Sequence, residues 1–78
     1  MTDYRPMSCD RYAELELATL RKEQLRVAWR TEQGQNRMDQ LRPLDLRTRH
    51  KAEYLIAEDS QGNALEIRLD RIRRFEGL

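Results

Sequence analysis

The side chains that could do chemistry are few and lie far apart in the chain. The single histidine, His50, has no cysteine, serine or carboxylate at a spacing typical of a catalytic triad or a metal site. The single cysteine, Cys9, excludes an internal disulfide and is interpreted as a small core residue rather than a reactive thiol. The three glycines are scattered, so no phosphate-binding loop is formed. The sequence therefore predicts a binding protein that is not an enzyme and needs no cofactor.

One pair of carboxylates has a spacing that invites a chemical role. Asp10 and Glu14 are four residues apart, which places them on the same face of a helix. General acid catalysis would require a buried carboxyl group with a raised pKa, and nothing in the surrounding sequence implies such burial. We therefore expect the two acids to be solvated and to act through their charge.

The charged residues are unevenly distributed along the 78 residues, although the net charge is only +1. Residues 1–20 carry a net charge of −2, residues 21–51 carry +5, and residues 52–78 carry −2. The acidic and basic segments could form separate surfaces or intermix on folding, and the sequence leaves both open.

The length allows one domain over 8–78, preceded by a flexible arm over 1–7. No apolar span or signal peptide is recognised, so the cytoplasm is the expected location.

The first predicted element is a helix over residues 9–20, with Ser8 as its N-cap. The apolar stripe that we expect to cover the sheet consists of Cys9, Tyr12, Ala13, Leu17 and Leu20. Leu15 falls outside this stripe. It is expected to be partly buried, and an exposed contact residue is the alternative.

The rest of the chain predicts strands. Residues 52–58 are apolar on both faces, as in a central strand, and a five-residue turn joins them to the alternating segment 64–69. Residues 24–31 also alternate. A last short strand is expected over 72–75. Such a helix followed by about five bent strands would close into a small barrel.

The segment between these strands is harder to interpret. Its apolar residues do not keep a period of two, which indicates a bulge. Pro43 cannot donate a ladder hydrogen bond and is expected at an edge or a strand end. Residues 47–51 are expected to form a polar, basic connection.

Several short motifs resemble one known family at matching spacing. They are Tyr4–Pro6, Cys9–Tyr12, Leu15–Ala18, Asp45–Leu46, Glu53–Leu55 and Glu66–Ile72. Together they make the chain similar to the Rho-binding antiterminator (Rof) family of small bacterial proteins. The resemblance implies a mainly β, Sm-like fold, in which one N-terminal helix precedes a five-stranded, strongly bent small barrel.

The resemblance also implies a function and a partner. Rof proteins bind the transcription termination factor Rho at its RNA-binding region, block RNA loading and so reduce Rho-dependent termination. We expect carboxylates of this chain to stand where RNA phosphates would lie, and we expect the protein to be a monomer. The partner-binding residues predicted from the motifs and the acidic helix are Asp10, Tyr12, Glu14, Glu16, Asp45, Arg49, Lys51 and Glu53.

Two features depart from this expectation. The net charge is slightly basic, and Arg11 stands where an acid would help. A small Sm-like RNA-binding module is therefore an alternative, with the basic segment 21–51, the arginine-rich C-terminal end and the aromatic residues Trp29 or Tyr54 as its contacts. An interaction domain with another partner is the third possibility.

Overall fold

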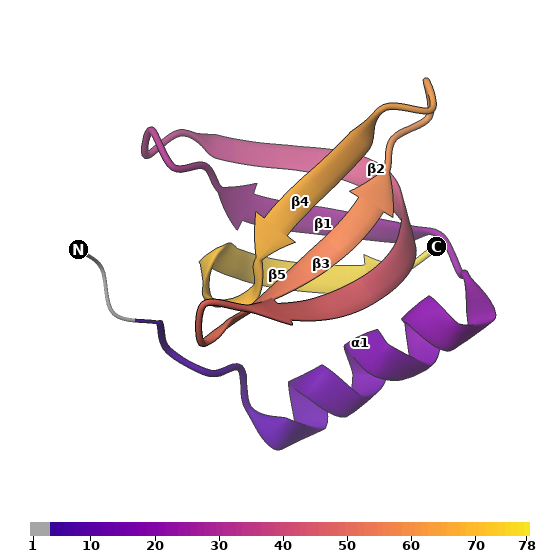
Figure 1. Cartoon of the computed structure of the whole chain (residues 1–78). Coiled ribbons are helices and arrows are strands. Elements are labelled where there is room, and N and C mark those ends of the chain that lie inside the picture. The colour runs from indigo at the N-terminus through magenta and orange to yellow at the C-terminus, as the bar shows by residue number, and fades with distance from the viewer. Residues whose placement is uncertain (1–3) are drawn as a thin grey trace.

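The computed structural model describes residues 4–78 as one helix followed by five strands (Figure 1). The elements are α1 (Cys9–Arg21), β1 (Leu25–Arg30), β2 (Asn36–Arg49), β3 (Ala52–Glu58), β4 (Ala64–Arg68), a short 3-10 turn (Leu69–Arg71) and β5 (Ile72–Gly77). Among these residues no helix is long and apolar enough to cross a membrane.

The strands form one strongly bent antiparallel sheet in the order β4-β3-β2-β1-β5 (Figure 1). The long strand β2 carries the bend, because its first half pairs with β1 and its second half pairs with β3. β4 and β5 lie at the two edges and do not pair with each other within the described residues, so the curled sheet stays open. The expected mainly β fold of one helix and five strongly bent strands is confirmed, but the expected closure into a barrel is not, because β4 and β5 do not pair among residues 4–78.

The strands that alternate in the sequence also alternate in burial. Leu25, Val27 and Trp29 of β1 are buried, and their neighbours Arg26 and Arg30 are exposed. The hairpin of β3 and β4 forms as expected, with β3 between β2 and β4. The core therefore lies inside the curve of the sheet, where the inward faces of these strands meet.

β2 differs from the sequence-based expectation. Pro43 was expected at an edge or a strand end, but it lies inside a central strand and is fully buried. At Pro43 only β3 pairs with β2, because the pairing with β1 ends at Leu41. The predicted bulge follows directly, since the register with β3 shifts between Pro43 and Asp45. Residues 47–49 continue the strand. The connection to β3 is only His50 and Lys51, both at positive φ, as in a tight type I′ hairpin turn.

α1 begins and ends with capping contacts. The Ser8 side chain accepts a hydrogen bond from the Arg11 backbone N–H at 3.4 Å, as the predicted N-cap should. At the other end Lys22 adopts a left-handed conformation, and its N–H bonds to the carbonyls of Ala18 and Thr19. These caps set the length of the helix that lies against the sheet.

The face that α1 buries was predicted wrongly. Leu15 is completely buried in the core, together with Ala18 and Thr19 one turn further on. The small side chains of Ala18 and Thr19 let the helix approach the sheet, and the Thr19 hydroxyl donates to the Leu15 carbonyl at 2.7 Å. Leu15 is therefore neither partly buried nor an exposed contact residue.

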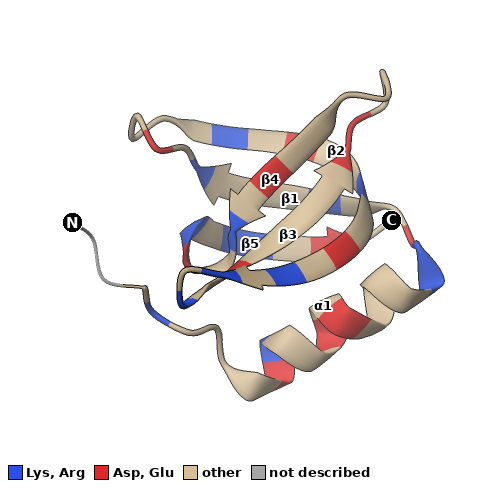
Figure 2. Ribbon diagram, viewed as in Figure 1, with Lys and Arg blue, Asp and Glu red and all other residues tan. Residues whose placement is uncertain are grey.

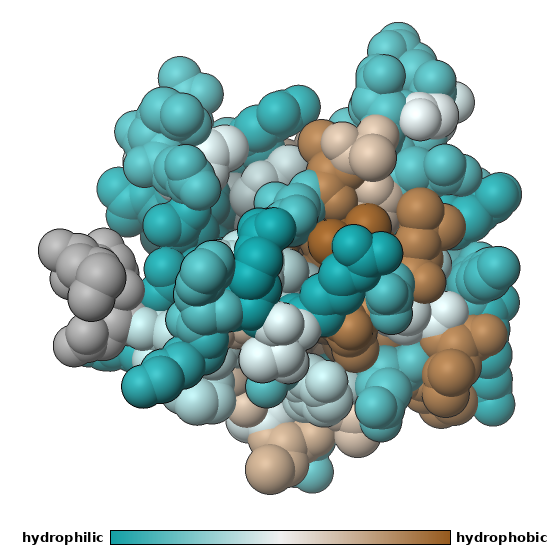
Figure 3. All heavy atoms as spheres, viewed as in Figure 1, coloured by the Kyte–Doolittle hydropathy of each residue, from teal (hydrophilic) through white to brown (hydrophobic). Residues whose placement is uncertain are grey.

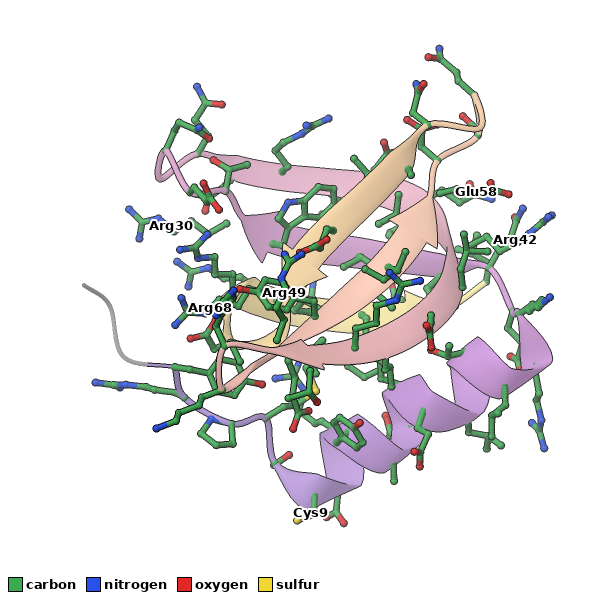
Figure 4. All side chains as sticks on the ribbon, in the orientation of Figure 1. Cys9, Arg30, Arg42, Arg49, Glu58 and Arg68 are labelled. Carbon is green, nitrogen blue, oxygen red and sulfur yellow. The ribbon has the colours of Figure 1, made fainter. Side chains whose placement is uncertain are left out.

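Most of the expected apolar stripe faces outward instead. Leu17 and Leu20 are 46% and 76% exposed, and Ala13 is exposed as well. Cys9 is exposed at the start of the helix, so the prediction of a core cysteine was also wrong (Figure 4). Of the stripe only Tyr12 packs partly against the core.

The segment before α1 is tied to the other end of the chain. Of the arm expected over 1–7, residues 1–3 lie outside the described residues, whereas Tyr4 and Met7 pack partly against the core. The Arg68 guanidinium lies over the Tyr4 ring at 5.4 Å and contacts Asp70 at 2.9 Å. Asp70 also accepts a hydrogen bond from the Arg5 backbone N–H at 3.2 Å.

The packing of α1 predicts that Leu15→Ala will be strongly destabilising. The substitution removes a fully buried side chain and leaves a cavity, which costs about 2–5 kcal/mol of the free energy of unfolding in a domain core. Urea denaturation followed by circular dichroism measures this loss. Leu20→Ala, on the exposed face of the same helix, is the control and should change stability by less than about 0.5 kcal/mol. Equal losses in the two variants would contradict the described orientation of α1.

The ion pair of Arg68 and Asp70, which anchors the segment before α1, predicts a second difference in stability. Asp70→Asn leaves the Arg68 charge nearly buried, because the two side chains are only 11% and 14% exposed, and should cost about 3 kcal/mol. Asp45→Asn disrupts the exposed pair with Arg47, at 54% and 66% exposure, and should cost less than about 1 kcal/mol. The same denaturation experiment compares them, and a loss in Asp45→Asn as large as in Asp70→Asn would exclude the anchor.

Candidate protein-binding surface

The outward face of α1 carries free carboxylates. Asp10 and Glu14 are exposed one turn apart, and neither forms an ion pair with any residue in 4–78. Glu16 is exposed at the side of the same helix. Figure 2 shows these acids in red along α1. Because Leu15 is held in the core, this face cannot turn inward, and its negative charge stays available to a partner.

The same face also carries apolar surface. Leu17 follows Glu14 by three residues and Asp10 by seven, so it shares their side of the helix, and Leu20 lies beside it one turn further on. Figure 3 shows brown, apolar surface over the C-terminal half of α1. Exposed leucines next to unpaired acids are unusual for a purely solvated helix and are typical of contact surfaces. We name the set Asp10, Ala13, Glu14, Leu17 and Leu20 the acidic helix face.

Three more of the predicted residues come together where α1 lies near the start of β3. Tyr12 is half-buried between the helix and the sheet, and burial together with the charges of Glu53 and Glu16 raises its pKa. Glu53, at the start of β3, is also close to Tyr4. Burial, then the carboxylates of Glu53 and Asp70, raise the pKa of Tyr4 to about 12. Tyr12, Glu16 and Glu53 thus form a second acidic group with a neutral phenol at its centre.

The remaining predicted residues are held elsewhere. The Asp45 carboxylate contacts the Arg47 side chain at 3.1 Å and accepts from the Leu46 N–H at 2.9 Å. Arg49 pairs with Glu66 of β4 and lies over the Tyr54 ring at 5.0 Å. These contacts are with the sheet, so the structure does not join Asp45 or Arg49 to the acidic helix face.

Lys51, the last predicted residue, is exposed at the tip of the β2–β3 turn. Its neighbour Ala52 pairs with Arg49, which puts Lys51 at the same end of the hairpin as Arg49 and two residues before Glu53 in the chain. Lys51 therefore lies at the margin of the second acidic group.

Sequence reasoning missed a structural role for the two terminal motifs. Tyr4 in the first motif and Arg68 and Asp70 in the last were noted only as family-like residues, but they contact one another across the chain. The signal that could have found this contact was the presence of both terminal motifs in one small domain, since the two ends of a domain often lie close together. This contact holds the chain that leads into α1 beside Glu53.

The arrangement is suited to binding a protein partner. Within residues 4–78 no group of three or more histidine, cysteine or acidic side chains is placed to hold a metal ion. The acids of the acidic helix face are exposed, and no basic side chain of the described residues forms an ion pair with them. Such a surface complements a positively charged protein surface that has an apolar patch.

A solved structure has a similar fold. The proteasome accessory factor B/C (PafBC) of Arthrobacter aurescens matches 99% of this chain with a TM-score of 0.79. The sequence identity is 23%, and the match spans 12% of that much longer protein. At this identity the likeness indicates a shared fold and nothing more.

Sequence comparisons identify the family. The chain is 36% identical to protein rof of Escherichia coli (strain K12) over 72 residues, which is 92% of this chain and 80% of that protein. Protein rof of Shigella flexneri matches to the same extent. A family model described as modulator of Rho-dependent transcription termination matches residues 6–78. The chain therefore belongs to the Rof family of modulators of Rho-dependent transcription termination.

Proposed function

We propose that this protein binds the termination factor Rho at its primary RNA-binding region, prevents RNA from loading and so reduces Rho-dependent termination. It acts in the cytoplasm, as a monomer and without catalysis. The observation that carries the proposal is the acidic helix face, where Asp10 and Glu14 are exposed and unpaired beside Leu17. Membership of the Rof family supports Rho as the partner.

The physical basis of the proposal is mimicry of RNA. A surface that binds single-stranded RNA combines cationic side chains for the phosphates with apolar or aromatic platforms for the bases. Asp10 and Glu14 would take the places of two phosphates, and Leu17 would rest on a platform meant for a base. Because α1 is already folded and capped, little conformational entropy is lost when it docks.

The other predicted residues extend this surface. Glu16 and Tyr12 of α1 and Glu53 of β3 lie near one another and would contact the rim of the same site on Rho. Lys51 would lie at the margin of this rim. Asp45 and Arg49, which the sheet holds through Arg47 and Glu66, are proposed as peripheral contacts of smaller effect.

Charge reversal tests the electrostatic part of the proposal. The double variant Asp10→Lys/Glu14→Lys should weaken binding to purified Rho by about a hundredfold, because two attractive contacts become repulsive. The wild-type affinity should fall steeply with salt, and this dependence should weaken in the variant. Biolayer interferometry across a sodium chloride series measures both, with RNA as a competitor.

The matched control is Glu32→Lys/Glu76→Lys. These two acids are 80% and 63% exposed and lie away from α1, so the control makes the same change in net charge. It should leave Rho affinity within about threefold of wild type. If the control weakened binding as much as the α1 variant, net charge alone would explain the effect, and mimicry by the helix would be excluded.

Truncation of the leucines tests the apolar part. Leu17→Ala/Leu20→Ala should weaken Rho binding about tenfold, since each exposed side chain would lose its burial against the partner. Its stability should match that of wild type, and its salt dependence should be unchanged because no charge is altered. Unchanged affinity in this stable variant would restrict the contact to the acids.

A further inference from the structure

A series of arginines extends from the start of β2 across β5 and the 3-10 turn to the end of β1. Three adjoining hollows share these side chains: Arg73 lines the first and second, and Arg30 and Arg71 line the second and third. Arg37 and Arg74 line the first hollow. We name these five residues, Arg30, Arg37, Arg71, Arg73 and Arg74, the arginine track. The sharing of side chains makes it continuous.

The first hollow has a simple cause in the strand register. Ala28 of β1 pairs with Met38 of β2 on one side and with Arg74 of β5 on the other. A small side chain between two long ones leaves a depression with an apolar floor. Met38 is 54% exposed at its edge, and Trp29 also lines it. The hollow measures about 590 Å³, which is large enough for a nucleobase.

The track is short of compensating acids. Arg37, Arg73 and Arg74 form no ion pair with any residue in 4–78. Arg71 meets only Glu32, at 3.7 Å and with Glu32 80% exposed, which is a weak surface pair. Asp70 lines the second hollow, but Arg68 already neutralises it. Glu32 and Glu66 line the third hollow, where Glu66 is paired with Arg49, which lies outside the track. The track therefore presents a net positive charge.

Aromatic groups with stacked guanidiniums lie at both ends of the track. Arg37 covers the Trp29 ring at 5.5 Å beside the first hollow. Arg49 covers the Tyr54 ring at 5.0 Å, and both line the third hollow together with Arg30. Figure 4 shows Arg30, Arg49 and Arg68 at this end of the sheet. Guanidinium planes stacked in this way offer flat cationic surfaces on which a base can rest.

We infer that the arginine track binds single-stranded nucleic acid, with phosphates on the guanidiniums and an unpaired base in the hollow over Ala28. All five cations are arginines, whose planar fork matches phosphate oxygens with two hydrogen bonds. An apolar floor beside such cations suits a flat base more than the carboxylate side chains of an acidic protein. A duplex keeps its bases stacked inside and could not fill the hollow.

This inference goes beyond the proposed binding of Rho, because it uses the β1–β5 side of the sheet and none of the acidic helix face. The two surfaces carry opposite charge, so each can be disabled without changing the other. Its test therefore needs no Rho, and its failure would leave the proposed function untouched.

The direct test is a titration of the full-length protein with a fluorescently labelled 12-nucleotide oligouridine. Fluorescence anisotropy should show binding that weakens with salt, with a slope of log K against log salt of about −3 if most of the track contacts phosphates. Trp29 is the only tryptophan, so its emission should change on binding as a base enters the neighbouring hollow.

Paired variants locate the site. Arg73→Gln/Arg74→Gln should weaken oligouridine binding about tenfold and make the salt slope shallower by about 1.4, the value for two lost phosphate contacts. Arg42→Gln/Arg47→Gln removes the same charge from exposed arginines outside the track and should change affinity less than twofold. Figure 4 shows Arg42 beside Glu58 at the other end of the sheet. Circular dichroism confirms that both variants fold.

Four results would overturn the inference. They are absence of binding at 50 mM salt or below, equal loss in the two double variants, binding of polyglutamate of matched charge as tightly as oligouridine, and tighter binding of a 12-base-pair duplex than of the single strand. The third would identify a site for acidic proteins, and the fourth a site that reads only the phosphate backbone of a duplex.

Discussion

The burial of Leu15 is the contact on which the rest of the surface depends. It fixes the rotation of α1 against the sheet, with Ala18 and Thr19 allowing close approach. Once that rotation is set, the opposite side of the helix must face solvent, and it carries Asp10, Glu14 and two exposed leucines. The same residue thus stabilises the core and decides which chemistry the helix presents. This is how a small hydrophobic contact determines an electrostatic surface.

A second constraint acts at the ends of the chain. The Arg68–Asp70 pair and the Tyr4 ring hold the segment before α1 beside the sheet.

The basic residues behave differently from the acids of α1. Some arginines of the middle segment are paired across strands, as in Arg42 with Glu58, whereas Arg37, Arg73 and Arg74 of the arginine track form no ion pair within residues 4–78. The acidic and basic segments therefore intermix across the strands of the sheet, as in Arg42 with Glu58 and Arg26 with Glu76, and remain separate along α1.

Much of the fold could be predicted from the sequence, because alternation in strands is a local signal. The buried series Leu25, Val27 and Trp29 and the β3–β4 hairpin are examples. The orientation of α1 could not be predicted, since apolar residues occur on both of its sides and the choice depends on how closely the helix can approach the sheet. Pro43 was misplaced for a related reason, because only the register with β3 shows that a bulge accommodates it inside a central strand.

The candidate site was predicted in part. The sequence marked the acids of α1, but contacts between distant residues separated Arg49 from them and joined Glu53 to Tyr12.

The most direct test of the account is an NMR titration of the 15N-labelled protein with the RNA-binding region of Rho. Amide shifts concentrated at residues 9–20 and near Glu53, with β5 unchanged, are the predicted result. Shifts confined to β1 and β5, with α1 unaffected, would contradict it.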